Sequence, residues 1–486
     1  MSTPPPVPRQ ATLAGQTLPA AALASGPEGP RALRPLLDTV LEALDTGALA
    51  RGGPLPVGGP EAVAARVRQA AGEILPDQGD PHALRTLVHV FAEGAADPSH
   101  PLCAAHLHCP PLAIAAAADL AASALNPSLD SWDQAPAASE LETLVARALA
   151  REIYGDGRQK APRTPDSLVT TGGTESNQVA LLLAREASGG AVRLVCGANA
   201  HHSLARAAWL LGLPEPVVVP APAGALDPAA LDETLTRLPG PLLVAATAGT
   251  TGAGLIDPLP EIAAHCAAHG ARLHIDAAYG GGLLFSTRHR AALTGLDAAD
   301  TVTLDLHKLG WQPIAAGLLA VKDPRDLTAL RQRADYLNAA DDTEAGLPDL
   351  LGRSLRTTRR PDVLKLAVTL KTLGRGGLGT LVDQVCARAR EFAALVHDHP
   401  GFTLHAPPVI STVLFRPAGA TDADVAAVRR ALLTDGRAVL GRTRLDGRLW
   451  LKATLLNPAT GPDDLAALLH LVAARRATLV EGHTPR

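Results

Sequence analysis

The stretch "DTVTLDLHKLGWQP", residues 300–313, has the pattern of a short apolar strand that ends at a histidine and a lysine. The chain has only six lysines against 38 arginines, yet it places one of them, Lys308, at the end of this strand. Arginine stays protonated in proteins, whereas a desolvated lysine amine can act as a nucleophile and form an imine. The stretch therefore predicts a buried strand that presents a reactive amine.

Similar short runs recur upstream, and Ala- and Leu-rich helical runs alternate with them. Together with "TVTLDL" itself, the runs are "SLVTT", "VRLVC", "PVVVP", "PLLVAAT" and "ARLHID". Buried apolar strands that alternate with helices are typical of a parallel sheet covered on both faces. We therefore expect an α/β fold with a mostly parallel sheet.

Changes of pattern along the chain predict four segments. Residues 1–30 are rich in Pro, Ala and Gly and are expected to form a loosely ordered tail. Residues 31–100 carry three helical patterns, and residues 101–375 form a large domain that also includes helices over 112–125 and 138–153. Residues 376–486 place two helical runs around the strands "STVLFRP" and "LWLKATLL", which predicts a small α+β domain.

The composition is that of a globular protein, with 47% hydrophobic and 19% charged residues in 486. A net charge of −4 and 2% aromatic residues give no basis for binding nucleic acid or an anionic membrane. Five scattered cysteines without a CxxC spacing favour a reducing compartment. No apolar run is long enough to span a bilayer, and the first residues lack the layout of a secretory signal, so we expect a cytoplasmic protein.

Small residues follow the first predicted strand of the sheet. "SLVTT" is followed by "GGTESNQVALLLAR", in which Gly172, Gly173 and Thr174 precede a helix. Free N–H groups at a helix N-terminus bind phosphate, although a simple helix cap accounts for the same residues. The pattern is neither GxGxxG nor GxxxxGK[ST], so a dinucleotide or a nucleoside triphosphate is not favoured.

Other strands also end in polar side chains, and parallel strands bring their carboxyl ends to one edge. Asp276 ends "ARLHID", Thr247 ends "PLLVAAT", and His201 begins the helix after "VRLVC". Singly, each has a structural explanation, as a capped carboxylate, a plain turn or a packed ring. Together with Lys308 they give an amine, an acid, a flat ring and a phosphate cradle, which are the groups that pyridoxal phosphate requires.

The chain resembles the pyridoxal-phosphate-dependent group II amino-acid decarboxylases from about residue 99 to residue 475. The motifs that carry the resemblance are "HLHCPP", "NPSLDSWDQAPAASELE", "TTGGTESNQVALLLAR", "ANAHHSLARAA", "ATAGTTGAGLIDPL", "HIDAAYGG", "LDLHKLGWQP", "DYLN", "SLRTTRRPDVLKL" and "LLNP". The resemblance implies a fold-type I architecture and pyridoxal 5′-phosphate as the cofactor.

The resemblance also implies roles for individual residues. Lys308 would hold the cofactor covalently, Asp276 would pair with the pyridine nitrogen, and His201 would stack on the ring. The remaining implied contacts are Gly173, Thr174 and His307 to the phosphate, and Thr247 and Ala278 to the ring. Tyr336, in "DYLN", matches a tyrosine of a mobile catalytic loop that returns a proton to Cα. Thr358, in "SLRTTRR", would contact the phosphate in the neighbouring subunit of a homodimer, with the active site at the interface.

Among the subgroups, the motifs look most like the diaminobutyrate and siderophore-type lysine decarboxylases. A substrate with a distal ammonium would favour a carboxylate in its pocket, which Asp130 or Asp133 could supply, with His106 nearby. Decarboxylation of lysine or ornithine, of aspartate or glutamate, or of an aromatic amino acid remains an alternative, as does transamination. A metal-binding protein built on "HLHC" and "HH" is a further alternative, but this spacing matches no common zinc pattern, so no metal is expected.

Overall fold

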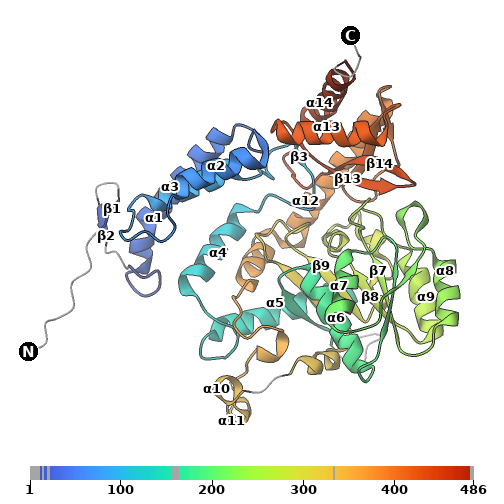
Figure 1. Ribbon diagram of the computed structural model, residues 1–486. Helices are drawn as coiled ribbons and strands as arrows, with labels where there is room; N and C mark the ends of the chain where they lie inside the picture. The colour runs from blue at the N-terminus through green and yellow to red at the C-terminus, as the bar shows by residue number, and fades with distance from the viewer. Residues whose placement is uncertain (1–10, 14–15, 19–21, 156–163, 332–333, 482–486) are drawn as a thin grey trace, which may run out of the picture.

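The computed structural model describes residues 11–481 apart from residues 14–15, 19–21, 156–163 and 332–333 (Figure 1). Half of the tail expected over residues 1–30 lies outside the described residues. In the described part, the short strands β1 (Ala11–Leu13) and β2 (Gln16–Leu18) precede the first helix. Three helices follow, α1 (Gly29–Arg51), α2 (Gly59–Ala71) and α3 (Ala83–Gly94), and they lie beside the rest of the chain.

The large central sheet has seven strands in the order β4-β10-β9-β8-β7-β5-β6. Their bounds are β4 Asp166–Thr170, β5 Arg193–Gly197, β6 Val217–Val219, β7 Leu242–Thr247, β8 Arg272–Asp276, β9 Thr301–Asp305 and β10 Gly317–Val321. The expected mostly parallel sheet is confirmed, because only β10 runs antiparallel to its neighbours. The strand β10, whose run "GLLAV" comes shortly after the lysine, was not predicted.

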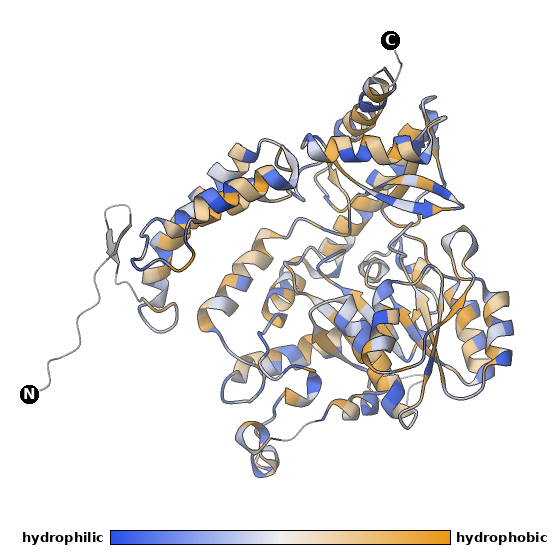
Figure 2. Ribbon diagram, viewed as in Figure 1, coloured by the Kyte–Doolittle hydropathy of each residue, from blue (hydrophilic) through white to orange (hydrophobic). Residues whose placement is uncertain are grey.

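Helices cover this sheet on both faces, as the alternation of buried residues in β7 shows. Leu243 and Ala245 pack in one apolar cluster with α6 and α7, while Val244 and Ala246 pack in the other with α5, α8 and α9. Figure 2 shows the apolar strands enclosed in this way. The helices are α4 Ala113–Leu125, α5 Pro136–Tyr154, α6 Gly173–Ala187, α7 His202–Leu210, α8 Pro228–Arg237 and α9 Leu259–His269.

A second, five-stranded sheet has the order β11-β12-β14-β13-β3. Four of its strands are C-terminal: β11 Phe402–Leu404, β12 Thr412–Pro417, β13 Val439–Leu445 and β14 Arg448–Thr454. The fifth, β3 (Cys103–Ala104), comes from the N-terminal side and pairs with β13. This pairing ties the chain just before the "HLHC" motif to the C-terminal sheet.

The remaining helices connect and cover these sheets. They are α10 Asp335–Asn338, α11 Ala340–Glu344, α12 Val363–Asp398, α13 Asp422–Thr434 and α14 Pro462–Glu481, with 3-10 turns at Pro222–Gly224, Gly280–Phe285, Arg290–Leu293, Leu296–Ala298, Pro324–Leu330 and Leu351–Arg353. The boundary expected at residue 375 falls inside α12, next to Gly374, whose φ of 62° interrupts the helix. Within the described ranges, no helix has the length and apolar character needed to cross a membrane.

A buried ion pair fixes two segments that the sequence associates with the site. Arg359, next to Thr358, donates from Nη1 and Nη2 to the two carboxylate oxygens of Glu142 on α5, both at 2.6 Å. Both side chains are only 1% exposed. The backbone of Arg359 also accepts a hydrogen bond from Leu129, next to Asp130. This bidentate pair therefore holds the segments around Thr358 and Asp130 against each other and against α5.

We expect Glu142→Gln to lower the free energy of unfolding by about 3 kcal/mol or more, because it leaves the Arg359 charge buried without a compensating carboxylate. The measurement is the midpoint of urea unfolding. Glu140→Gln, an exposed position on the same helix, is the matched control and should leave the midpoint unchanged. Equal midpoints for the two variants would contradict the stabilising role of the pair.

Candidate active site

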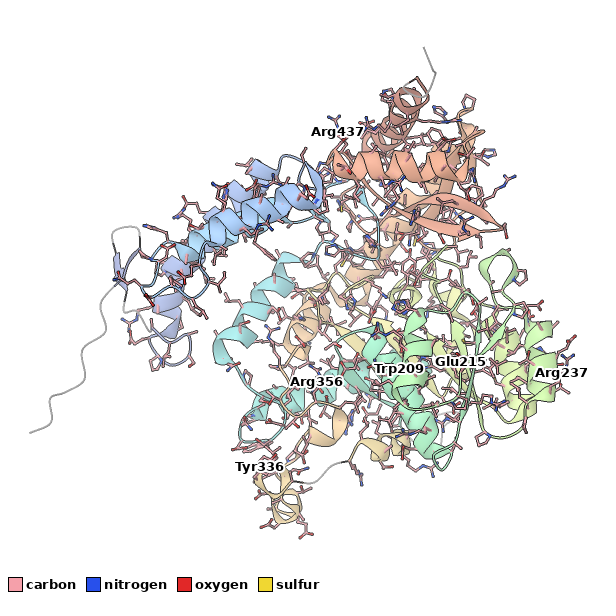
Figure 3. All side chains as sticks on the ribbon, in the orientation of Figure 1. Trp209, Glu215, Arg237, Tyr336, Arg356 and Arg437 are labelled. Carbon is pink, nitrogen blue, oxygen red and sulfur yellow. The ribbon has the colours of Figure 1, made fainter. Side chains whose placement is uncertain are left out.

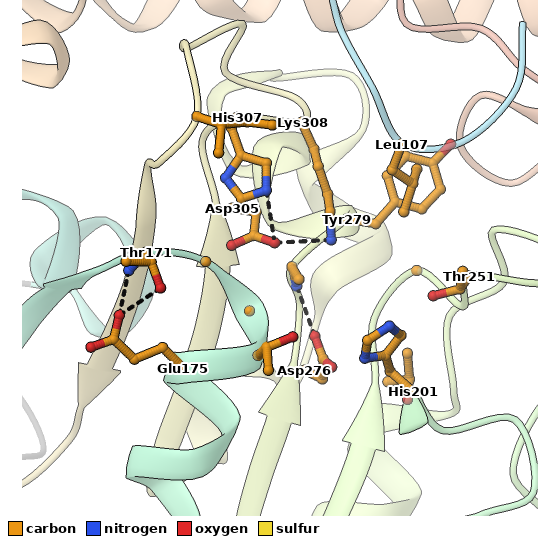
Figure 4. Close-up of a pocket in the computed structure, with 17 residues that line it drawn as sticks. Leu107, Thr171, Glu175, His201, Thr251, Asp276, Tyr279, Asp305, His307 and Lys308 are labelled. Carbon is orange, nitrogen blue, oxygen red and sulfur yellow. Dashed lines mark hydrogen bonds and ion pairs between the residues drawn. The ribbon is translucent and has the colours of Figure 1, made fainter. Parts of the chain in front are cut away.

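A cavity of about 310 Å³ lies at the carboxyl ends of β7, β8 and β9, where α6 and α7 begin (Figure 4). This volume is at the lower end of the range for small-molecule sites. Eight of the predicted residues line it: Gly173, Thr174, His201, Thr247, Asp276, Ala278, His307 and Lys308. The pattern of strand ends, together with the family resemblance for Ala278, thus predicted which residues the fold brings together.

Lys308 follows β9 and directs its amine into the cavity (Figure 4). Its Nζ lies 2.9 Å from Oδ2 of Asp305, the last residue of β9, whose side chain is 2% exposed. The same oxygen is 3.5 Å from Nε2 of His307. Asp305 therefore holds the amine at a fixed point over the strand end.

Asp276 ends β8, which runs parallel to both β7 and β9, so that Asp276 lies opposite Thr247 on one side and Thr303 on the other. Its carboxylate is almost fully buried. Oδ2 accepts a hydrogen bond from Asn177 Nδ2 at 2.8 Å, and Oδ1 accepts one from the backbone N–H of Ala278 at 3.1 Å. These two donors offset the desolvation of the carboxylate and fix its orientation at the cavity wall.

The glycines before α6 form a tight cradle. Gly172 has a φ of 153°, and a Cβ at this position would lie 3.0 Å from Cε1 of His307. A Cβ on Gly173 would lie 3.1 Å from both the Ala278 Cβ and the Asp305 Oδ2. Only glycine leaves this space open, directly before the first turn of a 15-residue helix.

His201 caps the N-terminus of α7 and lines the cavity from the side opposite the glycines. Its Nδ1 accepts the backbone N–H of Ser203 at 3.3 Å. Burial is the main cause that lowers the pKa of His201, and the nearby His202 and Lys308 lower it further, while Asp276 and Asp305 oppose the shift. The ring is therefore neutral near pH 7, as suits a flat surface packed against an aromatic cofactor.

Pyridoxal phosphate fits these residues. Three buried polar atoms around the cavity have no hydrogen-bond partner among the described residues: Thr247 Oγ1, Asp305 Oδ1 and His307 Nδ1. Buried orphan atoms of this kind at a cavity wall indicate a bound polar group. The amine of Lys308, the carboxylate of Asp276 and the glycine cradle would supply the attachment point, the partner of the ring nitrogen and the phosphate site of such a cofactor.

Five predicted residues do not line the cavity of this chain. Asp130 is buried and accepts a hydrogen bond from Gln134 Nε2 at 2.7 Å, and His106, Asp133 and Thr358 are exposed. Tyr336, on α10, is 84% exposed and points away from the rest of the chain (Figure 3). The roles implied for these residues stay predictions. Among the described residues, no group of three or more His, Cys, Asp and Glu side chains could hold a metal ion.

Two carboxylates of the cavity were not predicted from the sequence. Asp305 ends its strand as Asp276 does, so the rule of strand ends applies to it equally, although the histidine and lysine that follow it are the more conspicuous signal. Glu175 gives a weaker signal in the sequence, because an acidic residue in the first turn of a helix often serves only to cap it. Its Oε2 does so here, accepting hydrogen bonds from the backbone N and the Oγ1 of Thr171 at 2.6 and 2.7 Å. Its other oxygen lies 3.5 Å from Arg356.

Comparison with known families identifies one that matches most of the chain. The family described as the pyridoxal-dependent decarboxylase conserved domain matches residues 75–418. An L-2,4-diaminobutyrate decarboxylase of Rhizobium meliloti (strain 1021) is 42% identical over 400 residues, which are 79% of either chain. A protein of the same name from Acinetobacter baumannii is 33% identical over 434 residues, 82% of this chain and 84% of the relative.

Solved structures agree with these sequence matches. The crystal structure of the glutamate decarboxylase domain of diaminobutyrate-pyruvate transaminase and L-2,4-diaminobutyrate decarboxylase from Vibrio parahaemolyticus has a TM-score of 0.82 to this chain. It is 30% identical, and the match covers 94% of this chain and 98% of that one. Oryza sativa TDC with PLP and tryptamine, at 23% identity and a TM-score of 0.83, shares the fold.

Proposed function

The chain belongs to the pyridoxal-dependent decarboxylase family, and on this premise we propose that its substrate is L-2,4-diaminobutyrate. The protein is an enzyme, a carboxy-lyase that uses pyridoxal phosphate to release CO2 from an amino acid. The observation that carries the choice of substrate is the 42% identity, over 79% of both chains, to a diaminobutyrate decarboxylase. The product of this reaction would be 1,3-diaminopropane.

When bound, pyridoxal phosphate supplies an electron sink for the charge left on Cα as CO2 departs. The residues of the cavity serve this chemistry in different ways. Lys308 would anchor the cofactor through its amine, which Asp305 holds in place. Asp276 would accept a hydrogen bond from the ring nitrogen and so favour its protonated form, and His201 would pack against the ring. The glycine cradle at the start of α6 would bind the phosphate.

Tyr336 is our proposed donor of the proton that replaces the carboxylate at Cα. A phenol can act as a general acid once water is shut out of a closed site. Tyr336 lies outside the cavity in this chain, so this role requires α10 to approach a cavity, either its own or that of a second subunit. The proposal rests on the match of "DYLN" to the catalytic loop of the family.

We expect the cofactor-loaded protein to release CO2 from L-2,4-diaminobutyrate with a kcat/KM at least about tenfold above that for aspartate, glutamate or an aromatic amino acid, because these side chains leave unpaired a buried carboxylate that pairs with a distal ammonium. The panel is diaminobutyrate, lysine, ornithine, aspartate, glutamate and the aromatic amino acids. A preference for an acidic or an aromatic substrate would contradict the proposed substrate while leaving the decarboxylase intact.

We propose that the protein is a homodimer. Large apolar side chains are exposed on the N-terminal helices and on α4, among them Leu41 (63%), Leu49 (74%), Phe91 (77%) and Leu125 (67%). Extended exposed apolar surface on adjacent helices is typical of an interaction surface. A second subunit would cover it, and would also give the exposed Thr358 a phosphate to contact.

We further propose a cytoplasmic location. The cysteines of the chain are all free: Cys103, Cys109, Cys196, Cys266 and Cys386. Free thiols in this number suit a reducing compartment.

The dimer proposal makes a prediction for Asp130, which we propose faces the distal ammonium of a substrate in the partner's cavity. Lys308→Ala and Asp130→Asn should each be poorly active, since one lacks the cofactor anchor and the other lacks the carboxylate. When the two variants are unfolded, mixed in equal amounts and refolded, about a quarter of the sites should be wild type, because each mixed dimer then contains one intact site. Recovery of activity on mixing is the measurement.

One control variant and a check on dimer formation accompany this mixing experiment. Asp133→Asn, at a neighbouring exposed carboxylate, should keep its activity without mixing if Asp130 alone binds the ammonium. Mass spectrometry should show that mixed dimers form. If such dimers recover no activity, Asp130 acts in the cavity of its own chain or lies outside any cavity, and the proposed role is wrong.

A further inference from the structure

A closed hydrogen-bond network lies directly behind the cavity, with the fully buried Asn177 of α6 at its centre. The side-chain amide of Asn177 uses all four of its hydrogen bonds. Nδ2 donates to Asp276 Oδ2 at 2.8 Å and to Ser203 Oγ at 2.9 Å. Oδ1 accepts from Thr303 Oγ1 and His274 Nε2, both at 3.0 Å. The amide thus links two neighbouring strands, β8 and β9, to α7.

The chemistry of the partners fixes the direction of each bond. The Asp276 carboxylate accepts hydrogen bonds, so the amide nitrogen of Asn177 must face it and the amide oxygen must face His274. His274 must then donate from Nε2. Burial lowers the pKa of His274 to about 4, so its ring is neutral, and Nδ1 accepts from Thr301 Oγ1 at 2.8 Å. The network therefore has one consistent arrangement of protons.

The same logic extends to His201 in the cavity. His201 Nδ1 accepts the backbone N–H of Ser203, so it has no proton to give to Ser203 Oγ, which lies 2.8 Å away and accepts from Asn177; the hydroxyl proton of Ser203 is therefore directed to Nδ1. The backbone N–H of Ser203 donates to the same nitrogen at 3.3 Å. With two donors directed at Nδ1, this nitrogen is unprotonated, and the neutral ring carries its proton on Nε2.

We propose that Asn177 and Ser203 are positioning residues that act on Asp276 and His201 through one network. Asn177 orients the Asp276 carboxylate, and Ser203, held by Asn177, keeps the proton of the His201 ring on Nε2. The side-chain amide of Asn177 thereby orients Asp276, which would pair with the pyridine nitrogen of the cofactor. Through Ser203 it also orients the imidazole ring of His201, which would pack on the cofactor. His201 presents Nε2–H as a donor, since its other nitrogen is bound back to Ser203. This inference depends on cofactor binding and is independent of which amino acid is the substrate.

The test uses Ser203→Ala and Asn177→Ala, with Ser139→Ala as the matched control. Ser139, on α5, is also buried, but its hydroxyl donates to the carbonyl oxygen of Ala135, which does not line the cavity. The first measurement, on cofactor-free protein labelled with 15N-histidine, is the 15N resonance of His201 Nδ1, assigned by its loss in His201→Gln. The second is the dissociation constant of pyridoxal phosphate, with the absorbance of the bound cofactor followed against pH.

In the wild type we expect the 15N resonance of His201 Nδ1 to be that of an unprotonated nitrogen. In Ser203→Ala we expect this resonance to move toward the value for a mixture of the two neutral tautomers. Asn177→Ala should weaken cofactor binding roughly tenfold or more and alter the pH titration of the bound absorbance, because Asp276 loses a charge-assisted hydrogen bond. The Ser139→Ala control should match the wild type in both measurements.

Two results would overturn the proposal: a protonated His201 Nδ1 in the wild type, or a Ser203→Ala variant whose His201 resonance equals that of the wild type. If Asn177→Ala does not fold, Ser203→Ala decides alone, because it removes one hydroxyl and leaves the bond between Asn177 and Asp276. Neither measurement uses enzyme activity on an amino acid. The test therefore stands even if the proposed substrate is wrong.

Discussion

Lys308→Ala is expected to lower CO2 release by at least about ten-thousandfold, which is the largest loss predicted for any single substitution. Alanine offers no amine to anchor the cofactor, and it leaves the buried carboxylate of Asp305 without its partner at 2.9 Å. The variant should also lose covalent retention of the cofactor. After borohydride reduction of the wild type, peptide mass analysis should find pyridoxyl on Lys308, and on the variant it should find none.

Lys371→Ala is the matched control, since this lysine is exposed on α12 and far along the chain from the site. It should retain wild-type turnover and the pyridoxyl label at Lys308. A label on another lysine of the wild-type protein, or turnover by Lys308→Ala close to that of the control, would disprove the assignment of the anchoring residue.

Asp276→Ala should lower kcat roughly a hundred- to a thousandfold, the range found when a preorganised electrostatic contact to developing charge is removed. In the proposed role the carboxylate keeps the ring nitrogen protonated, so its loss would weaken the electron sink that the cofactor supplies. Binding of the cofactor should suffer less than turnover, because the phosphate cradle and Lys308 remain. Steady-state kinetics at saturating cofactor separate the two effects.

Two comparisons make this second result specific. Asp276→Glu keeps the charge but cannot keep both hydrogen bonds from Asn177 and Ala278. Its kcat should therefore lie between the kcat of Asp276→Ala and that of the wild type. Asp232→Asn, which removes a surface carboxylate bound to two histidines, should leave kcat unchanged. Full turnover by Asp276→Ala would show that another group serves the ring nitrogen.

Much of the fold and of the cavity could be predicted from the sequence because a simple rule connects them. In a parallel sheet the strand ends meet at one edge whatever the strand order, so the last residues of β7, β8 and β9 had to lie near each other. This is why Thr247, Asp276 and Lys308 could be grouped from the sequence alone. The alternation of apolar strands and helices predicted the six parallel strands on the same basis.

The features that the sequence pattern did not predict depend on which helices and strands are neighbours in the fold. The role of Asn177 requires α6 to pack across β8 and β9, so that one amide contacts Asp276, His274 and Thr303. A polar residue on an otherwise apolar helix face is the only local signal of this packing. The strand β10 was missed because it runs antiparallel between β4 and β9, and nothing in "GLLAV" specifies an insertion there.

Four residues that the resemblance associates with the site do not line the cavity of this chain. Tyr336, Thr358 and Asp133 are exposed in this structure, and Asp130 is buried beside Gln134 outside the cavity. Periodicity and strand-end rules describe contacts within one folded chain. They give no information on a helix that moves or on a surface that a second subunit covers.

The most direct test of the central claim is the stoichiometry of products formed from L-2,4-diaminobutyrate by the cofactor-loaded protein. We predict one CO2 and one 1,3-diaminopropane for each substrate consumed, with neither product formed by Lys308→Ala. Consumption of the amino acid with formation of a keto acid and no CO2 would contradict decarboxylation and indicate transamination instead.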